Sequence, residues 1–552
     1  MLLNVNNITK YINEKEILKD ISFKLYKGYK VGLVGQNGIG KTTLFRTIVG
    51  ELKPNNGNVT IYGKFGYLPQ HISFNKDIKV YDFIKSVDNY AEVLKILSKF
   101  DLKNIEDRNI STLSGGEKTK LYLVKLILEE PDMLILDEPT NHLDYDSIVW
   151  LESFINSFNG AVLMITHDRY FLDNTVAKIF ELENKTINEY NGNYSFYAEK
   201  KKLEYEKAMQ EYEEYIKEKK KLEIAARSHM NRANKYNDMS QNDFQRGKSA
   251  KIAKRSKAII SRIEKMDKKE KPLEIKKISM KFDDNNTKIN ETLIRAENLS
   301  KSFDKPLFNN ISFNVCRHKR VAIVGKNGIG KSTLLKGLVG REQLSGNLYI
   351  SPSTRIGYFS QELENLNTEA TILEEIKEIN KDESFVRTLL GCMLFKSDDV
   401  YKQIKVLSLG ERVRVIFLKL ILQDNNLLVL DEPTNFLDIP TREIIEDALI
   451  NYNGAILLVS HDRYFIKKMA EEIWEISSNS LYQYLGGYEY YLSKKARPVR
   501  AEFTDRKEEI LSLEMTLSHI SFKMLNCNES EKKELEKEYF DIAKKIKALK
   551  NA

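Results

Sequence analysis

The stretch Leu33-Val-Gly-Gln-Asn-Gly-Ile-Gly-Lys-Thr-Thr-Leu44 occurs a second time as Ile323-Val-Gly-Lys-Asn-Gly-Ile-Gly-Lys-Ser-Thr-Leu334. Two further blocks recur in the same order, Leu134–Asp144 as Leu428–Asp438 and Ile165–Phe171 as Val459–Phe465. The two copies of the first block start 290 residues apart, and the copies of the others start 294 residues apart. So small a drift over blocks in fixed order predicts two copies of one domain.

Each copy has the pattern of an α/β domain. Short aliphatic runs alternate with helix-length segments, which favours a largely parallel sheet. Each glycine-rich block follows an apolar run, at 31–34 and 321–324, and precedes a helical pattern. This strand–loop–helix context is what a phosphate-binding loop requires and what a chance match lacks.

The two loops Gly35–Thr42 and Gly325–Ser332 both read G-x-x-x-x-G-K-[ST]. Glycines let backbone N–H groups turn toward phosphate oxygens, and the helix that follows adds the positive end of its dipole. The lysine then reaches the β- and γ-phosphates, and the Ser/Thr hydroxyl binds Mg²⁺. The nucleotide-binding residues predicted here are Gly35, Asn37, Gly38, Gly40, Lys41, Thr42 and Thr43, and Gly325, Asn327, Gly328, Gly330, Lys331, Ser332 and Thr333.

Adjacent carboxylates end the next aliphatic strand of each copy. Asp137 and Asp431 suit a Mg²⁺ contact, and Glu138 and Glu432 are placed to polarise the attacking water. An isolated Asp-Glu pair is usually a solvated turn, and a lone histidine is usually structural. His167 and His461 nevertheless each stand 29 residues after that glutamate, and this matched spacing favours contacts to the γ-phosphate. Gln70 and Gln361 are weaker candidates for sensing the metal and the water.

The remaining repeated block reads Leu113-Ser-Gly-Gly-Glu117 in the first copy and Leu407-Ser-Leu-Gly-Glu411 in the second. With it, both halves of the chain resemble the nucleotide-binding domains of the ATP-binding cassette superfamily. The resemblance implies Mg²⁺-dependent ATP hydrolysis, with this signature loop of one domain closing over ATP held by the other. It assigns ATP contacts to Ser114, Gly115, Gly116, Ser408 and Gly410. It also implies that Tyr11 and Phe303 stack on adenine, although a packing role is an equal alternative for each.

Composition narrows the class of protein further. Hydrophobic residues make up 42% of the chain and charged residues 30%, which suits a folded, soluble protein. The longest apolar runs, such as Ala161–Ile165, are far shorter than the roughly 20 residues that a membrane helix needs. No secretory signal is visible, and Cys316, Cys392 and Cys527 have no metal-ligand spacing. We therefore expect a cytoplasmic protein without a membrane domain or zinc module.

A charged segment separates the two copies. From about 198 to 271 the chain is dense in Lys and Glu, contains only Gly247 as a glycine and has no proline before Pro272. Two narrow apolar stripes at helical spacing predict an antiparallel helical hairpin, with arms of about 25 to 35 residues. They are Ala208, Tyr212, Tyr215, Leu222 and Ala226, and Ile252, Ile259, Ile263 and Met266.

The middle of this segment is strongly basic. Between Arg227 and Lys257 there are nine Lys or Arg residues and two Asp, whereas the net charge of the whole chain is +8. Such a stretch is normally a solvated helix or a flexible linker. Cationic and aromatic side chains at the tip, residues 231–249, instead suit phosphates and unstacked RNA bases. The candidates are Arg232, Lys235, Tyr236, Met239, Phe244, Arg246 and Lys248.

Tandem cassettes, a charged helical linker and no membrane domain together resemble the ABC-F family of ribosome-associated ATPases. Asn141-His-Leu-Asp and His167-Asp-Arg-Tyr-Phe are typical of that family. The resemblance implies a cytoplasmic monomer whose two cassettes pair within the chain and bind the 70S ribosome in the ATP-bound state. The linker then contacts the P-site tRNA and 23S rRNA at the peptidyl-transferase centre, and hydrolysis releases the protein.

Two features are similar to antibiotic-resistance members of the family. Only 44 residues separate Gln70 from Ser114, so the first cassette has no additional arm, and the linker is longer than a minimal connector. Such members dislodge lincosamides, pleuromutilins and streptogramin A. A housekeeping factor that rescues stalled ribosomes is the nearest alternative. An ATPase subunit of a drug exporter and a DNA-repair ATPase are more remote.

The predicted domains follow from these boundaries. They are a first cassette at 1–197, the hairpin linker at 198–272, a second cassette at 273–497 and a helical C-terminal extension at 498–552. The extension shows apolar residues at helical spacing. It resembles the extension of some resistance members, and a plain surface appendage is an equal alternative.

The second signature block has Leu409 where the first has Gly115. By the resemblance this loop faces ATP bound at Lys41, and a side chain there crowds the backbone approach. We therefore predict that the two sites hydrolyse ATP at different rates. Single-turnover hydrolysis by Glu138→Gln and by Glu432→Gln proteins measures this difference, and equal residual rates would contradict it.

Overall fold

The fold is taken from a computed structural model. It describes residues 1–552 apart from 71, 73–77, 85–96, 98–101, 103–104, 142, 239–242, 270, 273–291, 304, 361–365, 396–397, 436, 496–538, 540–541 and 544–552. The chain divides into two compact units, residues 1–488 and residues 489–552. The first unit contains both cassettes and the linker between them.

The first cassette is built on a six-stranded sheet in the order β5-β6-β7-β3-β8-β9, and a three-stranded antiparallel sheet β2-β1-β4 accompanies it. All neighbours in the larger sheet are parallel except β8 and β9. The strands are β1 Leu3–Ile12, β2 Lys15–Leu25, β3 Lys30–Val34, β4 Asn56–Ile61, β5 Phe65–Leu68, β6 Met133–Asp137, β7 Ala161–Ile165, β8 Lys178–Glu183 and β9 Thr186–Asn191.

The second cassette repeats this topology strand for strand. Its larger sheet runs β14-β15-β16-β12-β17-β18, and its smaller sheet runs β11-β10-β13. The strands are β10 Thr292–Ser302, β11 Pro306–Cys316, β12 Arg320–Val324, β13 Ser345–Ile350, β14 Ile356–Phe359, β15 Leu427–Asp431, β16 Ala455–Val459, β17 Glu472–Ser477 and β18 Ser480–Tyr484. The predicted tandem α/β architecture is confirmed.

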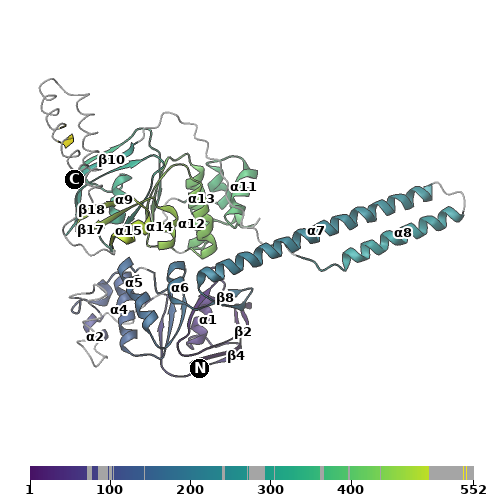
Figure 1. The fold of residues 1–552 in the computed structure, drawn as a ribbon, viewed down its shortest axis with the longest axis horizontal. Helices are drawn as coiled ribbons and strands as arrows, with labels where there is room; N and C mark the ends of the chain where they lie inside the picture. Colours follow the sequence, from purple (N-terminus) through teal and green to yellow (C-terminus); the bar gives the residue numbers. More distant parts are fainter. Residues whose placement is uncertain are drawn as a thin grey trace, which may run out of the picture. The chain divides into compact units, whose positions relative to one another are not determined.

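Helices cover the larger sheets (Figure 1). In the first cassette they are α1 Lys41–Ile48, α2 Val80–Ile84, α4 Gly115–Leu128, α5 Tyr145–Ser157 and α6 Arg169–Thr175. In the second they are α9 Lys331–Leu338, α10 Ile372–Lys377, α11 Glu383–Cys392, α12 Leu409–Leu422, α13 Ile439–Ile450 and α14 Arg463–Met469. Because helices pack on both faces, strands such as β6, β7, β15 and β16 are buried along their whole length, which explains their unbroken aliphatic sequences.

The sheet order places each phosphate loop at the carboxyl end of an inner strand. β3 and β12 lie inside their sheets, and α1 and α9 begin directly after the loops, at Lys41 and Lys331. Gly35 has φ +154°, and a Cβ there would lie 2.7 Å from the carbonyl oxygen of Leu182. Gly325 repeats this arrangement, with φ +150° and a distance of 2.6 Å from the Ile476 carbonyl oxygen. Only glycine therefore lets either loop turn this closely beside the neighbouring strand.

The linker forms two long helices that run antiparallel beside each other (Figure 1). Helix α7 spans Tyr194–Asp238 and α8 spans Asp243–Glu264. With 45 residues, α7 is longer than the predicted arms of about 25 to 35 residues, and with 22 residues α8 is shorter. α7 begins at Tyr194, within the region assigned to the first cassette. Its first turns are tied to that cassette, where Lys201 Nζ lies 2.8 Å from Glu181 and 2.7 Å from Glu183.

The two linker helices meet most closely through small side chains. Ala226 and Ala233 of α7, and Ser249 and Ser256 of α8, are buried, and the members of each pair stand seven residues apart. The Ser256 hydroxyl donates to the Ala226 carbonyl at 2.9 Å, and the Ser249 hydroxyl to the Ala233 carbonyl at 2.8 Å. The predicted hairpin is therefore present. Ala226 belongs to the predicted apolar stripe, whereas Ala233, Ser249 and Ser256 were not predicted.

No helix in the described part of the chain has the length and apolar character needed to cross a membrane. The last helix of the second cassette, α15, spans Tyr488–Lys495. The predicted C-terminal extension, 498–552, lies outside the described residues except for Tyr539, Ile542 and Ala543.

We expect Ala226→Leu to separate the two linker helices, because overpacking a tight contact costs roughly 1–3 kcal/mol. Hydrogen exchange followed by mass spectrometry measures this as faster exchange across the middle of α7 and α8. Ala225→Leu is the matched control, since Ala225 is only half-buried. Equal exchange in the two variants would contradict the close contact at Ala226.

Candidate functional site

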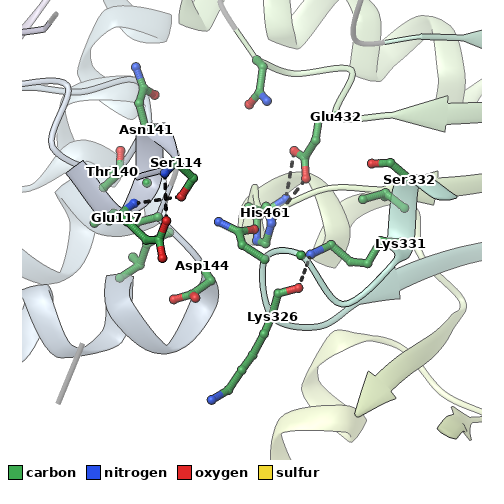
Figure 2. Close-up of a pocket in the computed structure, with 18 of the residues that line it drawn as sticks. Ser114, Glu117, Thr140, Asn141, Asp144, Lys326, Lys331, Ser332, Glu432 and His461 are labelled. Atoms are coloured by element: carbon green, nitrogen blue, oxygen red, sulfur yellow. Dashed lines mark hydrogen bonds and ion pairs between the residues drawn. The ribbon is translucent and has the colours of Figure 1, made fainter. Parts of the chain in front are cut away.

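A cavity of about 780 Å³ lies between the two cassettes and is lined by residues of both. Figure 2 shows Ser114, Asn141 and Asp144 of the first cassette on one side and Lys331, Glu432 and His461 of the second on the other. The predicted site residues that line it are Ser114, Gly115, Gly116, Glu138, Phe303, Asn327, Gly328, Gly330, Lys331, Ser332, Thr333, Glu432 and His461. The signature loop of one cassette thus faces the phosphate loop of the other.

Lys331 is held over its own loop at the bottom of this cavity. Its ammonium group donates to the carbonyl oxygens of Gly325 at 2.7 Å and Lys326 at 2.9 Å. Lys41 makes the same contacts in the first cassette, to Gly35 at 2.6 Å and Gln36 at 3.1 Å. Burial lowers the pKa of both lysines. A desolvated cation beside a helix N-terminus favours an incoming phosphate.

Ser332 and Asp431 fit a bound Mg²⁺. The Ser332 hydroxyl donates to the Asp431 carboxylate at 2.9 Å, so two oxygen ligands of the kind Mg²⁺ prefers lie side by side. Among the described residues, no group of three or more His, Cys, Asp or Glu gathers around a possible metal ion. That agrees with Mg²⁺ bound through one or two protein oxygens, the nucleotide phosphates and water. Thr42 and Asp137 hold the corresponding places in the first cassette.

The two predicted catalytic glutamates share an unusual backbone conformation. Glu138 has φ +53° and Glu432 has φ +51°, a region that side-chain-bearing residues rarely adopt. Hydrogen bonds from Glu138 N to the Ile165 carbonyl, at 2.8 Å, and from Glu432 N to the Val459 carbonyl, at 2.9 Å, hold it. Strained backbone held in this way clusters at functional sites.

Burial sets the protonation of the same groups. It raises the pKa of Glu138 to about 7 and that of Glu432 to about 8. Burial also lowers the pKa of His167 well below its usual value and that of His461 to about 3, so both histidines are neutral. Each histidine Nε2 lies 3.5 Å from the glutamate of its own cassette. A carboxyl whose pKa lies near neutrality beside a neutral imidazole suits general-base chemistry.

The first signature loop is fixed by a capping box. The Ser114 hydroxyl accepts from Glu117 N at 3.3 Å, and the Glu117 carboxylate accepts from Ser114 N at 2.8 Å. Ser408 and Glu411 repeat this arrangement at the start of α12. Each capping box fixes the position of the first helical turn. The N–H groups of that turn that remain free can bind an anion.

The first phosphate loop also contacts the opposite cassette. Asn37 N donates to the Asp438 carboxylate at 3.0 Å, and the Asn37 side-chain oxygen lies 3.1 Å from His167 Nε2. Asp438 ends one of the repeated blocks, and its counterpart Asp144 lines the cavity beside Lys331. Both phosphate loops therefore meet an aspartate from the other cassette.

The remaining predicted residues lie at the edge of this cavity, elsewhere on the cassettes, on the linker, or outside the described part of the chain. Tyr11 and Phe303 are 42% and 61% exposed, so neither is a core residue, and Phe303 lines the cavity. Gln70 is exposed at the end of β5, Gly410 lies in the first turn of α12, and Leu409 begins that helix with 41% of its surface exposed. Gln361 and Met239 lie outside the described residues, as do the side chains of Tyr236, Phe244, Arg246 and Lys248. Arg232 and Lys235 are exposed on α7.

Two buried ion pairs join the cassettes. Arg169 of α6 pairs with Glu446 of α13, and Arg463 of α14 pairs with Glu152 of α5. The two arginines are each only 2% exposed. The Arg169 guanidinium lies 4.0 Å from the ring centre of Tyr464, and that of Arg463 lies 4.2 Å from the ring centre of Tyr170. Each His-Asp-Arg-Tyr block thus contributes an arginine and an aromatic ring to a reciprocal contact.

The residues that make contacts between the cassettes were not predicted from the sequence. Asp144 and Asp438 could have been found, because both end a repeated block. The partners of Arg169 and Arg463 carried no such signal, because Glu446 and Glu152 lie 277 and 311 residues away in sequence.

Comparisons with known proteins agree with this architecture. The ABC transporter family model matches residues 18–141 and 308–435. ABC transporter F family member 5 of Arabidopsis thaliana is 31% identical, over 92% of this chain and 79% of that protein. Ribosome protection protein VmlR of Bacillus subtilis (strain 168) is 32% identical, over 99% of this chain and 98% of that protein. The chain belongs to the ABC-F family.

Two further proteins are similar to this chain. Energy-dependent translational throttle protein EttA of Escherichia coli (strain K12) is 31% identical, over 90% of this ABC-F chain and 95% of that protein. A solved structure of RNase-L Inhibitor shares the fold with a TM-score of 0.61, covering 89% of this chain and 92% of the other at 19% identity. As an ABC-F protein the chain is an ATPase that binds ATP with Mg²⁺.

We expect Glu446→Gln to destabilise the contact between the cassettes, because it leaves the buried Arg169 without its counter-charge. Removing one partner of a buried ion pair costs about 3–5 kcal/mol. A lower midpoint of thermal unfolding measures this loss. Glu443→Gln is the matched control, because Glu443 is 45% exposed and lies 3.8 Å from the same arginine. Equal shifts for both variants would contradict a special role of the buried pair.

Proposed function

We propose that the cavity between the cassettes holds one of two composite ATP sites. Lys331 and Ser332 contact the phosphates and Mg²⁺, and the start of α4 approaches the γ-phosphate from the opposite cassette. Glu432 polarises the attacking water, and neutral His461 contacts the γ-phosphate. Ser332 and Asp431 would hold Mg²⁺, which would supply positive charge against the phosphates. The second site pairs Lys41, Glu138 and His167 with the start of α12.

We further propose that this ATPase is cytoplasmic and acts as a monomer on the bacterial 70S ribosome, protecting it from antibiotics. The observation that carries the proposal is the similarity to VmlR, which is named a ribosome protection protein. That likeness spans 99% of this chain, so it includes the linker as well as both cassettes. The drug classes that fit are lincosamides, pleuromutilins and streptogramin A, which the sequence resemblance implies.

The chemistry of the linker supports a partner made of RNA. Arg227, Arg232 and Lys235 are exposed on α7 around a shallow hollow of about 480 Å³, and Ile224 beside them is 69% exposed. Cationic side chains supply affinity for phosphates, and an exposed apolar side chain packs on an unstacked base or a ribose. In the proposed complex this part of α7 approaches P-site tRNA and 23S rRNA.

A second function in the same family has a specific observation in its favour. EttA, named as a translational throttle, matches nearly as much of the chain at a similar identity. A housekeeping factor of that kind shares the ATP sites and the linker, and it differs in the effect of the bound protein. Both candidates require ATP-dependent ribosome binding, which is therefore tested first.

We expect the Glu138→Gln, Glu432→Gln double variant to sediment with purified ribosomes in ATP and to remain in the supernatant in ADP. The variant binds ATP but cannot release the closed state by hydrolysis, because both water-polarising groups are absent. Sedimentation through a sucrose cushion is the measurement. The same protein with Lys41→Ala and Lys331→Ala added is the control, and it should fail to bind under either condition.

Absence from the ribosome in both nucleotides would reject the proposal and favour the exporter-subunit alternative. If the protein binds, a second measurement separates the two candidates. The wild-type chain is expressed in a susceptible bacterium, and the inhibitory concentrations of the three drug classes are determined. Raised concentrations support protection, whereas unchanged concentrations support the housekeeping function.

A further inference from the structure

Arg442 makes a contact between the cassettes that the ion pairs do not explain. It lies in the first turn of α13, four residues after Asp438, and is 8% exposed. Its Nη1 donates to the carbonyl oxygen of His167 in the first cassette at 2.8 Å. The same nitrogen donates to Asp462 at 3.1 Å, and Nε donates to the Leu437 carbonyl at 3.0 Å. One buried guanidinium therefore ties both cassettes together beside His167.

These contacts belong to a closed ring of hydrogen bonds that includes Asn37 of the first phosphate loop. His167 reaches Asn37 through its side chain at 3.1 Å, and Asn37 N reaches back to Asp438 at 3.0 Å. Asp438 and Arg442 belong to the same turn of chain, because Arg442 N donates to the Asp438 carbonyl at 2.9 Å. The backbone carbonyl of His167 is therefore held directly by Arg442 of the second cassette. Its imidazole contacts Asn37 of its own cassette, and Asn37 in turn donates to Asp438 of the second.

The second site lacks this arrangement. Residue 148 corresponds to Arg442 in the repeat and is Ile148, a buried member of the apolar core of the first cassette. An isoleucine has no donor for a carbonyl oxygen, so it cannot hold the backbone of His461 in the same way. The two sites thus share their phosphate loops and glutamates but differ in how the histidine is held.

We propose that Arg442 is a positioning residue for ATP hydrolysis at the first site, where it holds His167 against the γ-phosphate only while the cassettes are in contact. Hydrolysis at Lys41 then depends on closure through Arg442. Hydrolysis at Lys331 depends on Arg442 less, because Arg442 lines that cavity and donates to Asp462, the residue after His461, but does not contact the His461 carbonyl. The inference concerns the ATPase itself and is independent of the ribosome. It rests on the proposed roles of Glu138 and Glu432.

The test isolates each site with a glutamate variant. In the Glu432→Gln protein only the Glu138 site retains its base, and in the Glu138→Gln protein only the Glu432 site does. Arg442→Gln in the Glu432→Gln background should lower the single-turnover rate constant about tenfold, the size expected from losing one hydrogen bond to a charged group. The ATP concentration at half-saturation should stay unchanged, because the phosphate loop is intact.

Three comparisons make the result specific. Arg442→Gln in the Glu138→Gln background should change the rate less than about twofold. Arg442→Lys should recover part of the loss at the first site, since an ammonium group still donates to the carbonyl. Arg320→Gln is the matched control, because Arg320 donates to the Ile450 and Tyr452 carbonyls at 2.7 and 3.2 Å within its own cassette, at the other end of β12 from the phosphate loop.

Equal slowing in both backgrounds, or loss of ATP binding with no rescue by lysine, would overturn the proposal in favour of a general structural role. An unchanged rate in the Glu432→Gln background would overturn it as well. If neither glutamate variant slows hydrolysis before Arg442 is altered, the glutamate roles themselves fail. That failure is visible separately, because it needs no change at Arg442.

Discussion

The contact between the two cassettes depends on two arginines that are almost completely buried. A buried guanidinium is tolerated only when a carboxylate neutralises it, and each arginine finds that carboxylate in the other cassette, at Glu446 or Glu152. The facing tyrosines, Tyr464 and Tyr170, cover the flat faces of the guanidinium groups. The cavity beside Lys331 is lined by residues of both halves, and this reciprocal arrangement holds those halves together.

The helix that carries Arg169 also contacts the start of the linker. Helix α6 begins at Arg169, two residues after His167, and its Asp173 accepts from the backbone N–H of Ser195 at 2.6 Å. Tyr194, the first residue of α7, is buried. Burial and the charge of Glu443 raise the pKa of its hydroxyl, and the charge of Arg169 lowers it. One short helix therefore connects the His167 loop to the start of the linker. Tyr488 holds the corresponding place at the start of α15.

Much of this arrangement was predictable from sequence, for a local reason. The phosphate loops, the Asp-Glu strand ends and the histidines are fixed by short segments whose glycines and aliphatic runs determine the backbone. The partners of Arg169 and Arg442 depend on which helix faces meet, and no short segment encodes that. The linker illustrates the same limit, because the apolar stripe that predicted the hairpin included Ala226 but not Ala233, which is also buried.

The internal repeat preserves backbone geometry more strictly than side chains. Glu138 and Glu432 have nearly equal φ angles, and the two sheets have the same strand order. Two substitutions between the copies, Gly115 against Leu409 and Ile148 against Arg442, concern one site, the one built on Lys41. Leu409 is predicted to narrow the approach of the signature loop, and Arg442 is the residue that we propose to position His167. A duplicated fold can therefore give its two ATP sites different dependence on closure without altering either phosphate loop.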